Sequence, residues 1–225
     1  MTTAEPRTGW FTWIGLFLAL GGPTFVAGPL AAIAGYPAPV RTAFVFLCLM
    51  WALLIPIGVI VVGPERQPLS SIGLRPFRWR SIGFGLAAAA AVIAALLAVS
   101  AFDSTTAQAD VARGVGTLAA WPLWLKILAV VTAGAVEETL YRGYAITRLS
   151  QLTGSRIVAA GISLVAFTLA HLPYWGAGAA AVVLAGGLAL TLLFLWKRDL
   201  LLVAVAHTAT DVFSLFVQPA LGLAG

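Results

Sequence analysis

Apolar runs about as long as a bilayer is thick recur along this chain, and they constrain its fold more than any other feature. A transmembrane helix needs about 20 consecutive apolar residues, whereas a helix of a soluble domain is typically about 10–14 residues long. Hydrophobic residues make up 61% of the chain, against about 45–50% in soluble domains, and charged residues make up only 9%. We therefore predict an all-α fold, a polytopic bundle of transmembrane helices.

The apolar runs divide the chain into about seven candidate spans. Their bounds are 10–35, 43–62, 82–102, 123–146, 157–172, 177–196 and 200–217. The first run contains Gly-Gly-Pro at 21–23 and a further Pro29, which predict a kinked or broken helix. It also has features of a signal peptide, because Arg7 precedes an apolar run that ends in small residues at 31–34.

Positive residues indicate how such a bundle is oriented in the membrane. The loop 63–81 carries four arginines against the single acid Glu65, and positive loops are retained in the cytoplasm. Counting spans from this loop places the N-terminus inside and the loop 103–120 outside. Within loop 63–81, the stretch 74–79 mixes arginines with aromatic residues, so it is either an interfacial segment in the headgroups or a solvated connector. The net charge of +5 therefore favours membrane orientation over a nucleic-acid surface.

Two adjacent glutamates, Glu137 and Glu138, lie in the middle of the apolar run 121–144, and Arg142 follows one helical turn later. Charges inside membrane segments are costly, so they face a bundle interior or a wet cavity and usually serve function. Residues four apart share a helix face, so Glu138 can pair with Arg142 and offset its burial. Glu137 points into another sector without an obvious cation, which suits a general acid/base. The alternative is a purely structural network of both glutamates with Arg142.

The chain has two histidines, and both lie in apolar spans. His171 follows Phe167 by one helical turn, and Asp211 follows His207 by one turn. Alone, His171 is more typical of packing or capping than of catalysis, whereas His207 with Asp211 fits a self-satisfied hydrogen-bonded pair as well as it fits a functional one. At about 1.5 Å per residue, however, Glu137, His171 and His207 fall within a band of membrane depth under about 10 Å thick. We therefore predict that one cavity collects them.

Three motifs result, in order: Glu-Glu-x-x-x-Arg at 137–142, Phe-x-x-x-His at 167–171 and His-x-x-x-Asp at 207–211. Together they resemble the CPBP family of intramembrane glutamic endopeptidases, which includes the CAAX prenyl endopeptidases and the bacterial Abi-type proteins. The resemblance covers 121–219. We therefore expect a single membrane domain, 1–225, with accessory N-terminal spans in 1–120 and a catalytic core in 121–219.

The resemblance implies peptide-bond hydrolysis without a covalent intermediate. Glu137 and His171 would activate a water, and His207 with Asp211 would stabilise the oxyanion, while Glu138 and Arg142 support the site. The better-described prenyl endopeptidases have asparagine at the position of Asp211. An ionised Asp211 would repel an oxyanion, so this residue either orients a protonated His207 or is itself protonated.

The resemblance also implies the surroundings of the enzyme. We expect a membrane-embedded or lipidated protein or peptide as substrate, a lipid bilayer as environment, and neither a cofactor, a metal nor a nucleic acid as partner. A multi-pass location in the cell membrane follows, and the alanine- and arginine-rich composition favours a bacterial cytoplasmic membrane.

Other functions fit the same residues. A glutamate and two histidines also suit zinc, although the chain has no His-Glu-x-x-His segment. A proton-coupled transporter could pass protons along the same acids and histidines. A third alternative is a non-catalytic immunity or scaffold protein, whose activity would survive the loss of Glu137.

Overall fold

The computed structural model describes residues 9–36, 38–100 and 105–221, and every regular element in these residues is helical. The elements are α1 (Trp10–Gly21), η1 (Gly22–Ala27), α2 (Gly28–Gly35), α3 (Pro39–Val62), η2 (Leu69–Ile72), α4 (Trp79–Ser100), α5 (Thr105–Ala119), α6 (Leu123–Thr132), η3 (Ala133–Ile146), α7 (Thr147–Thr153), α8 (Arg156–Trp175), α9 (Ala180–Lys197), α10 (Leu200–Val212), η4 (Phe213–Val217) and α11 (Gln218–Ala220). The predicted all-α fold is therefore confirmed.

Among the described residues, 6 helices are long and apolar enough to cross a membrane: Trp10–Gly35, Pro39–Val62, Trp79–Ala98, Arg156–Trp175, Ala180–Lys197 and Leu200–Val217. Only 22% to 39% of each apolar window is buried inside the bundle. Apolar surface of this extent requires a lipid environment. The chain is thus a multi-pass membrane protein, and the predicted polytopic bundle is confirmed.

The predicted span 123–146 is not one of these 6 helices. It is helical throughout, as α6 followed by η3, but it contains Lys126 in addition to Glu137, Glu138 and Arg142. Its charge therefore separates it from the others. The total of about seven spans and the N-terminus inside remain predictions.

The segment 103–120, which we predicted to be an outer loop, is mostly helical. Asp103 lies outside the described residues, as does Phe102 at the predicted end of the preceding span, but most of the loop forms the helix α5. The segment is rich in alanine and lacks proline, so it favours a helix. Asp110 fastens α5 to the connection between α8 and α9, because its Oδ2 accepts a hydrogen bond from the backbone N–H of Gly178 at 2.8 Å.

Prolines affect two of the spans differently. The run 10–35 is interrupted at the predicted place, because α1 ends at Gly21 and the π-helical segment η1, with Pro23 in its first turn, precedes α2. By contrast, the span 157–172 was predicted to end before Pro173, but α8 continues through this proline to Trp175. Pro173 has no N–H to donate to the carbonyl of Leu169, four residues earlier, and in membrane helices neighbouring groups can satisfy a carbonyl freed in this way.

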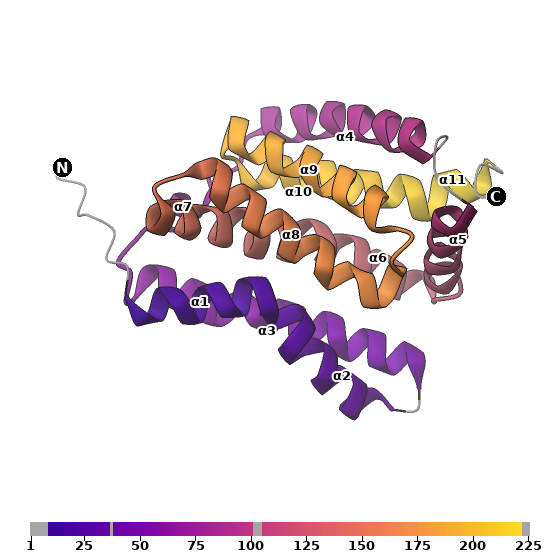
Figure 1. Ribbon diagram of the computed structural model, residues 1–225, viewed down its shortest axis with the longest axis horizontal. Coiled ribbons are helices and arrows are strands. Elements are labelled where there is room, and N and C mark those ends of the chain that lie inside the picture. The colour runs from indigo at the N-terminus through magenta and orange to yellow at the C-terminus, as the bar shows by residue number, and fades with distance from the viewer. Residues whose placement is uncertain (1–8, 37, 101–104, 222–225) are drawn as a thin grey trace.

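The helices pack around the segment η3 (Figure 1). The helix α10 lies between α4 and η3, α8 lies beside α9, and α1 and α3 cover the side opposite α4. Two glycines allow α10 to pack closely on both neighbours. A Cβ at Gly85 of α4 would lie 2.7 Å from the carbonyl oxygen of Leu202, and a Cβ at Gly134 of η3 would collide with the hydroxyl of Thr208.

A buried ionic network attaches the N-terminal helices to the rest of the bundle. Glu65, which is buried, accepts hydrogen bonds from Thr12 Oγ1 at 2.9 Å, from Tyr144 Oη at 2.8 Å and from Arg148 Nε at 2.8 Å. Thr12 belongs to α1, Tyr144 to η3 and Arg148 to α7. Glu65, which the sequence places in a basic loop, therefore links three helical elements through hydrogen bonds inside the bundle.

Candidate active site

The acidic pair lies on an unusually wide helix. The segment η3 forms i→i+5 hydrogen bonds over 14 residues, whereas the sequence predicts a regular α-helix there. π-helical turns are rare and occur frequently at functional sites. Gly134, at the start of η3, brings this segment against the backbone of α10, where its Cβ would lie 2.7 Å from the carbonyl oxygen of Ala204.

Glu138 is the centre of a buried charge network. Its Oε1 accepts a hydrogen bond from Arg142 Nη1 at 2.9 Å and another from His207 Nδ1 at 2.8 Å. The side chains of Glu138 and Arg142 are 0% and 1% exposed, so this ion pair is fully removed from solvent. Arg142 is also held by the carbonyl oxygen of Gly187 at 3.0 Å, and its guanidinium lies 4.2 Å from the ring centre of Phe167. The structure therefore joins three of the predicted site residues through one carboxylate.

Glu137 faces the other histidine. The distance from Glu137 Oε2 to His171 Nε2 is 3.8 Å. His171 Nδ1 lies 2.7 Å from the carbonyl oxygen of Phe167, and because a carbonyl can only accept, Nδ1 must carry the proton of this hydrogen bond. In a neutral imidazole, Nε2 then presents its lone pair towards Glu137. This arrangement fits two groups that share one small polar molecule.

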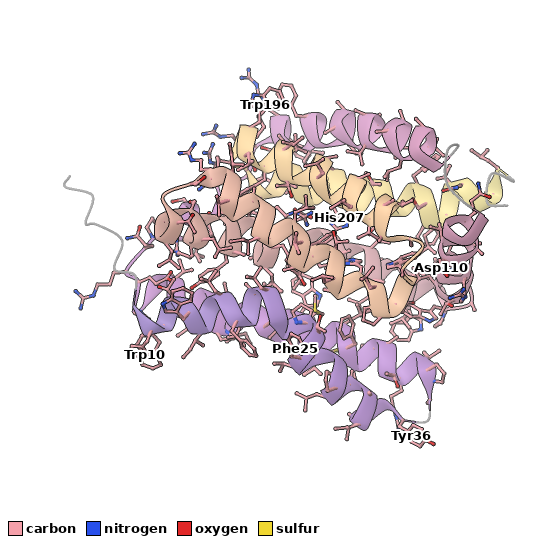
Figure 2. All side chains as sticks on the ribbon, viewed as in Figure 1. Trp10, Phe25, Tyr36, Asp110, Trp196 and His207 are labelled. Atoms are coloured by element: carbon pink, nitrogen blue, oxygen red, sulfur yellow. The ribbon has the colours of Figure 1, made fainter. Side chains whose placement is uncertain are left out.

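Asp211 lies at the open side of the group. Its Oδ2 is 3.6 Å from His207 Nε2, which exceeds hydrogen-bond distance. The side chain of Asp211 is 35% exposed, compared with 10% for His207, 18% for Glu137 and 22% for His171. Figure 2 shows His207 within the bundle, between the two ends marked by Trp196 and Asp110. Asp211 is therefore the most exposed of these four side chains.

Several buried polar atoms at this place have no hydrogen-bond partner among the described residues: Glu137 Oε2, Glu138 Oε2 and Tyr141 Oη. Each such group costs about 1–3 kcal/mol unless something satisfies it, and the large majority of buried polar atoms in proteins do have a partner. Their concentration on one turn of η3 indicates a position for a polar ligand, such as a water or a peptide group.

The three acids and two histidines of this group are not arranged to hold a metal ion. No group of three His, Cys, Asp or Glu side chains in the part of the chain that the structure describes is placed to hold a metal ion. The two histidines use one nitrogen each for other purposes, since His171 Nδ1 contacts Phe167 and His207 Nδ1 contacts Glu138. Only their Nε2 atoms point towards the remaining acids.

Some features of the site have no signal in the sequence. The link between Glu138 and His207 joins residues 69 positions apart, so no local spacing indicates it. The backbone carbonyls of Phe167 and Gly187, which orient His171 and Arg142, are equally invisible because any residue could supply them. Phe167 has a signal in its motif, and the structure shows its use: its ring packs against His171 with centroids 4.3 Å apart.

The fold and the site define a class: a multi-pass helical membrane protein with three acids and two histidines gathered in the bundle. Comparison with protein families is more specific. Residues 119–213 match the family model described as Rce1-like, type II CAAX prenyl endopeptidase Rce1-like. This part of the chain is therefore an Rce1-like domain of the CAAX protease family, as the three motifs predicted.

The match covers all three motifs but not the helices α1 to α4. No curated protein matches the chain, and no solved structure matches it either.

Proposed function

We propose that this chain is an intramembrane glutamic endopeptidase that hydrolyses a peptide bond of a membrane-associated or lipidated protein or peptide without a metal ion. Membership of residues 119–213 in a family of prenyl endopeptidases supports proteolysis in general. One observation carries the glutamic mechanism: Glu137 Oε2, buried and without a partner among the described residues, faces His171 Nε2 at 3.8 Å. A water can be shared by these two acceptors, since each accepts one of its hydrogens.

The first half of the proposed reaction uses Glu137 and His171. The water donates one hydrogen bond to each of them, and the Glu137 carboxylate removes one proton as the water oxygen attacks the carbonyl carbon of the scissile bond. The carbonyl π electrons move to its oxygen, which becomes the oxyanion of a tetrahedral intermediate. His171 orients the attacking oxygen, because its own Nδ1–H is fixed on the carbonyl of Phe167.

The second half uses His207. With its Nδ1–H held by Glu138 at 2.8 Å, the Nε2–H of a protonated His207 is available to stabilise the oxyanion. The oxyanion then re-forms the carbonyl, the C–N bond breaks, and the proton on Glu137 passes to the leaving nitrogen. Asp211, 3.6 Å from His207 Nε2, either orients the imidazolium or shares a proton with it. Arg142 balances the charge of Glu138 and has no direct contact with the reacting atoms.

The experiment compares membrane peptidomes of cells that express the wild-type protein, Glu137→Gln or Asp110→Asn. The Glu137→Gln amide keeps the shape of the carboxylate but cannot take a proton, so uncut precursors should accumulate. Asp110→Asn is the matched exchange of carboxyl for amide on α5, outside the group of acids and histidines, and it should leave the peptidome unchanged. A precursor pool that does not change with Glu137→Gln would refute the proposal.

The precursors identified in this way supply peptides for an assay with purified protein in detergent. Cleavage there, with no ion gradient, separates a protease from a proton-coupled transporter. Failure of Glu137→Gln to abolish cleavage would transfer the role of base to Glu138 or to a metal-bound water.

The location and organisation of the enzyme belong to the same proposal. The end of the bundle with the turn between α9 and α10 carries Lys197 and Arg198, and the loop before α4 carries further arginines. The positive-inside rule favours this end in the cytoplasm, hence an N-terminus inside, and the alanine- and arginine-rich composition favours a bacterial cytoplasmic membrane. The chain would form one domain, 1–225, in which 1–120 supports the catalytic core 121–219.

A further inference from the structure

Three arginines from separate connections converge at one end of the bundle, and we name them the basic cluster: Arg75, Arg156 and Arg198. Arg75 lies in the segment before α4, Arg156 is the first residue of α8, and Arg198 lies in the turn between α9 and α10. Figure 2 shows nitrogen-tipped side chains gathered at this end, near Trp196. In the sequence, each of these arginines is more than 40 positions from the next. Their proximity is thus a product of the fold.

Backbone and side-chain contacts hold these connections together. The N–H of Leu200 donates a hydrogen bond to the carbonyl oxygen of Gly73 at 2.9 Å, which fixes the segment before α4 on the turn after α9. Gly73 has φ +92 and is packed so closely that a Cβ would lie 2.9 Å from the ring of Phe194. Arg198 Nη2 donates to Thr147 Oγ1 at 3.3 Å, on the helix α7 that leads to Arg156. These contacts hold the three connections that carry the basic cluster against one another.

The charges of the basic cluster are not balanced by the protein. In residues 9–36, 38–100 and 105–221, no carboxylate lies within 4.0 Å of these three guanidinium groups. Asp199 is close in sequence, but its carboxylate accepts from Ser81 Oγ at 2.6 Å and from the N–H of Leu202 at 3.3 Å. Glu65 is occupied by Arg148. The basic cluster thus has charge to offer to an external anion.

Arg198 shows this most directly. Its backbone is left-handed, with φ 51, a conformation that is uncommon for a residue other than glycine. Its Nη1 is buried and has no hydrogen-bond partner among the described residues. Burial, followed by the neighbouring charges of Arg156, Arg75 and Arg148, lowers the pKa of Arg198. A strained, half-buried guanidinium held beside like charges is costly on its own, and an anion between the arginines would remove that cost.

Aromatic residues indicate which anion is available at this level. Trp196 and Trp79 flank the basic cluster in sequence and are 72% and 78% exposed. Exposed tryptophans are enriched at the level of the lipid headgroups, and basic pockets between helix ends on the cytoplasmic side bind anionic headgroups. We propose that Arg75, Arg156 and Arg198 bind the phosphate group of an anionic phospholipid headgroup. Free phosphate has the same chemistry, and the experiment distinguishes the two sources.

Arginine and lysine variants test the site separately from general electrostatics. The wild-type protein in a neutral detergent is titrated with dioleoylphosphatidylglycerol, and bound lipid is counted by native mass spectrometry. The triple variant Arg75→Lys, Arg156→Lys, Arg198→Lys keeps every charge but loses the planar fork that binds phosphate in a bidentate manner. Its affinity should fall about tenfold or more, since one charge-assisted hydrogen bond is worth about that factor.

The matched control changes three other arginines of the same end, namely Arg66, Arg78 and Arg80, to lysine, and it should bind the lipid as the wild type does. Affinity that is equal in both triple variants, or unchanged in the basic-cluster variant, would overturn the proposal. The single variant Arg75→Gln guards against misfolding, because Arg75 is exposed, and it too should bind more weakly. Thermal melts with inorganic phosphate identify the source: stabilisation by the lipid alone indicates a headgroup, and equal stabilisation by phosphate indicates the free ion. Proteolysis enters none of these measurements, so the proposed protease activity can fail independently.

Discussion

Removal of the Arg142 guanidinium should destabilise the protein strongly. Methionine at this position would occupy much of the aliphatic volume but would leave the Glu138 carboxylate, 0% exposed, with a single donor, His207 Nδ1. It would also remove the hydrogen bond to the Gly187 carbonyl and the contact with the ring of Phe167. Breaking a buried ion pair from one side costs about 3–5 kcal/mol. We expect Arg142→Met to lower the free energy of unfolding by this amount.

The measurement is a reversible unfolding titration in mixed micelles, with Arg113→Met as the matched control. Arg113 also pairs with an acid on its own helix, Asp110, at 2.8 Å, but its side chain is 70% exposed. An exposed pair contributes about 0–1 kcal/mol, so the control should lose little. The contrast between the two variants reports the burial of Arg142 with its added contacts, because both exchange arginine for methionine in an ion pair of similar length, 2.9 Å and 2.8 Å.

A second variant distinguishes an unpaired charge from lost packing. In the double variant Glu138→Gln, Arg142→Met neither charge remains, so no carboxylate is left unpaired. It should therefore be more stable than the sum of the two single losses predicts, by about 1–3 kcal/mol of interaction energy. Additive losses, or an Arg142→Met variant within about 1 kcal/mol of Arg113→Met, would refute the reasoning.

Three further predictions concern the site and its support. Asp211→Asn should retain much of the cleavage rate, because asparagine donates a hydrogen bond without repelling an oxyanion. Asp211→Ala should lower kcat by about 10²–10³. Equal inactivation of both variants would show that the carboxylate itself is essential. Incubation with a strong chelator should leave cleavage unchanged, and a loss that stoichiometric zinc restores would establish a metalloprotease instead. Glu65→Gln should lower the free energy of unfolding by about 3 kcal/mol, since it leaves Arg148 buried and unpaired. A thermal melt identical to that of the wild type would show that this buried ion pair does not stabilise the fold.

The class of fold could be predicted from the sequence because lipid exposure imposes length and composition on each span. The run 200–217 coincides with α10 and η4, since Asp199 caps its start through the N–H of Leu202. The helix α5 was mistaken for a loop, because a polar, alanine-rich segment between spans has no apolar run to mark it. The π-helical form of η3 was missed for a different reason: the pattern of apolar residues does not distinguish i→i+5 from i→i+4 hydrogen bonds.

The residues of the candidate site could be found from the sequence because ionisable side chains are conspicuous in a membrane span. Glu138 and Arg142 are four apart, so helical geometry alone predicts their pairing. The sequence could not predict which glutamate contacts which histidine. The contacts of Glu138 with His207 and of Glu137 with His171 depend on how η3, α8 and α10 are rotated against one another. Long-range contacts of this kind have no periodicity along the chain.

The two adjacent glutamates differ in how many hydrogen bonds their carboxylates already accept. Glu138 Oε1 already accepts from Arg142 and from His207, so a proton added to this oxygen would displace a charge-assisted hydrogen bond. Among the described residues, Glu137 Oε2 has no donor within hydrogen-bond distance, and it faces an imidazole nitrogen that can itself only accept while neutral. Two acceptors that face each other need a molecule with two hydrogens between them. Water meets this condition, and in the proposed reaction the second imidazole, that of His207 beside Glu138, would stabilise the negative charge that the attack of this water creates.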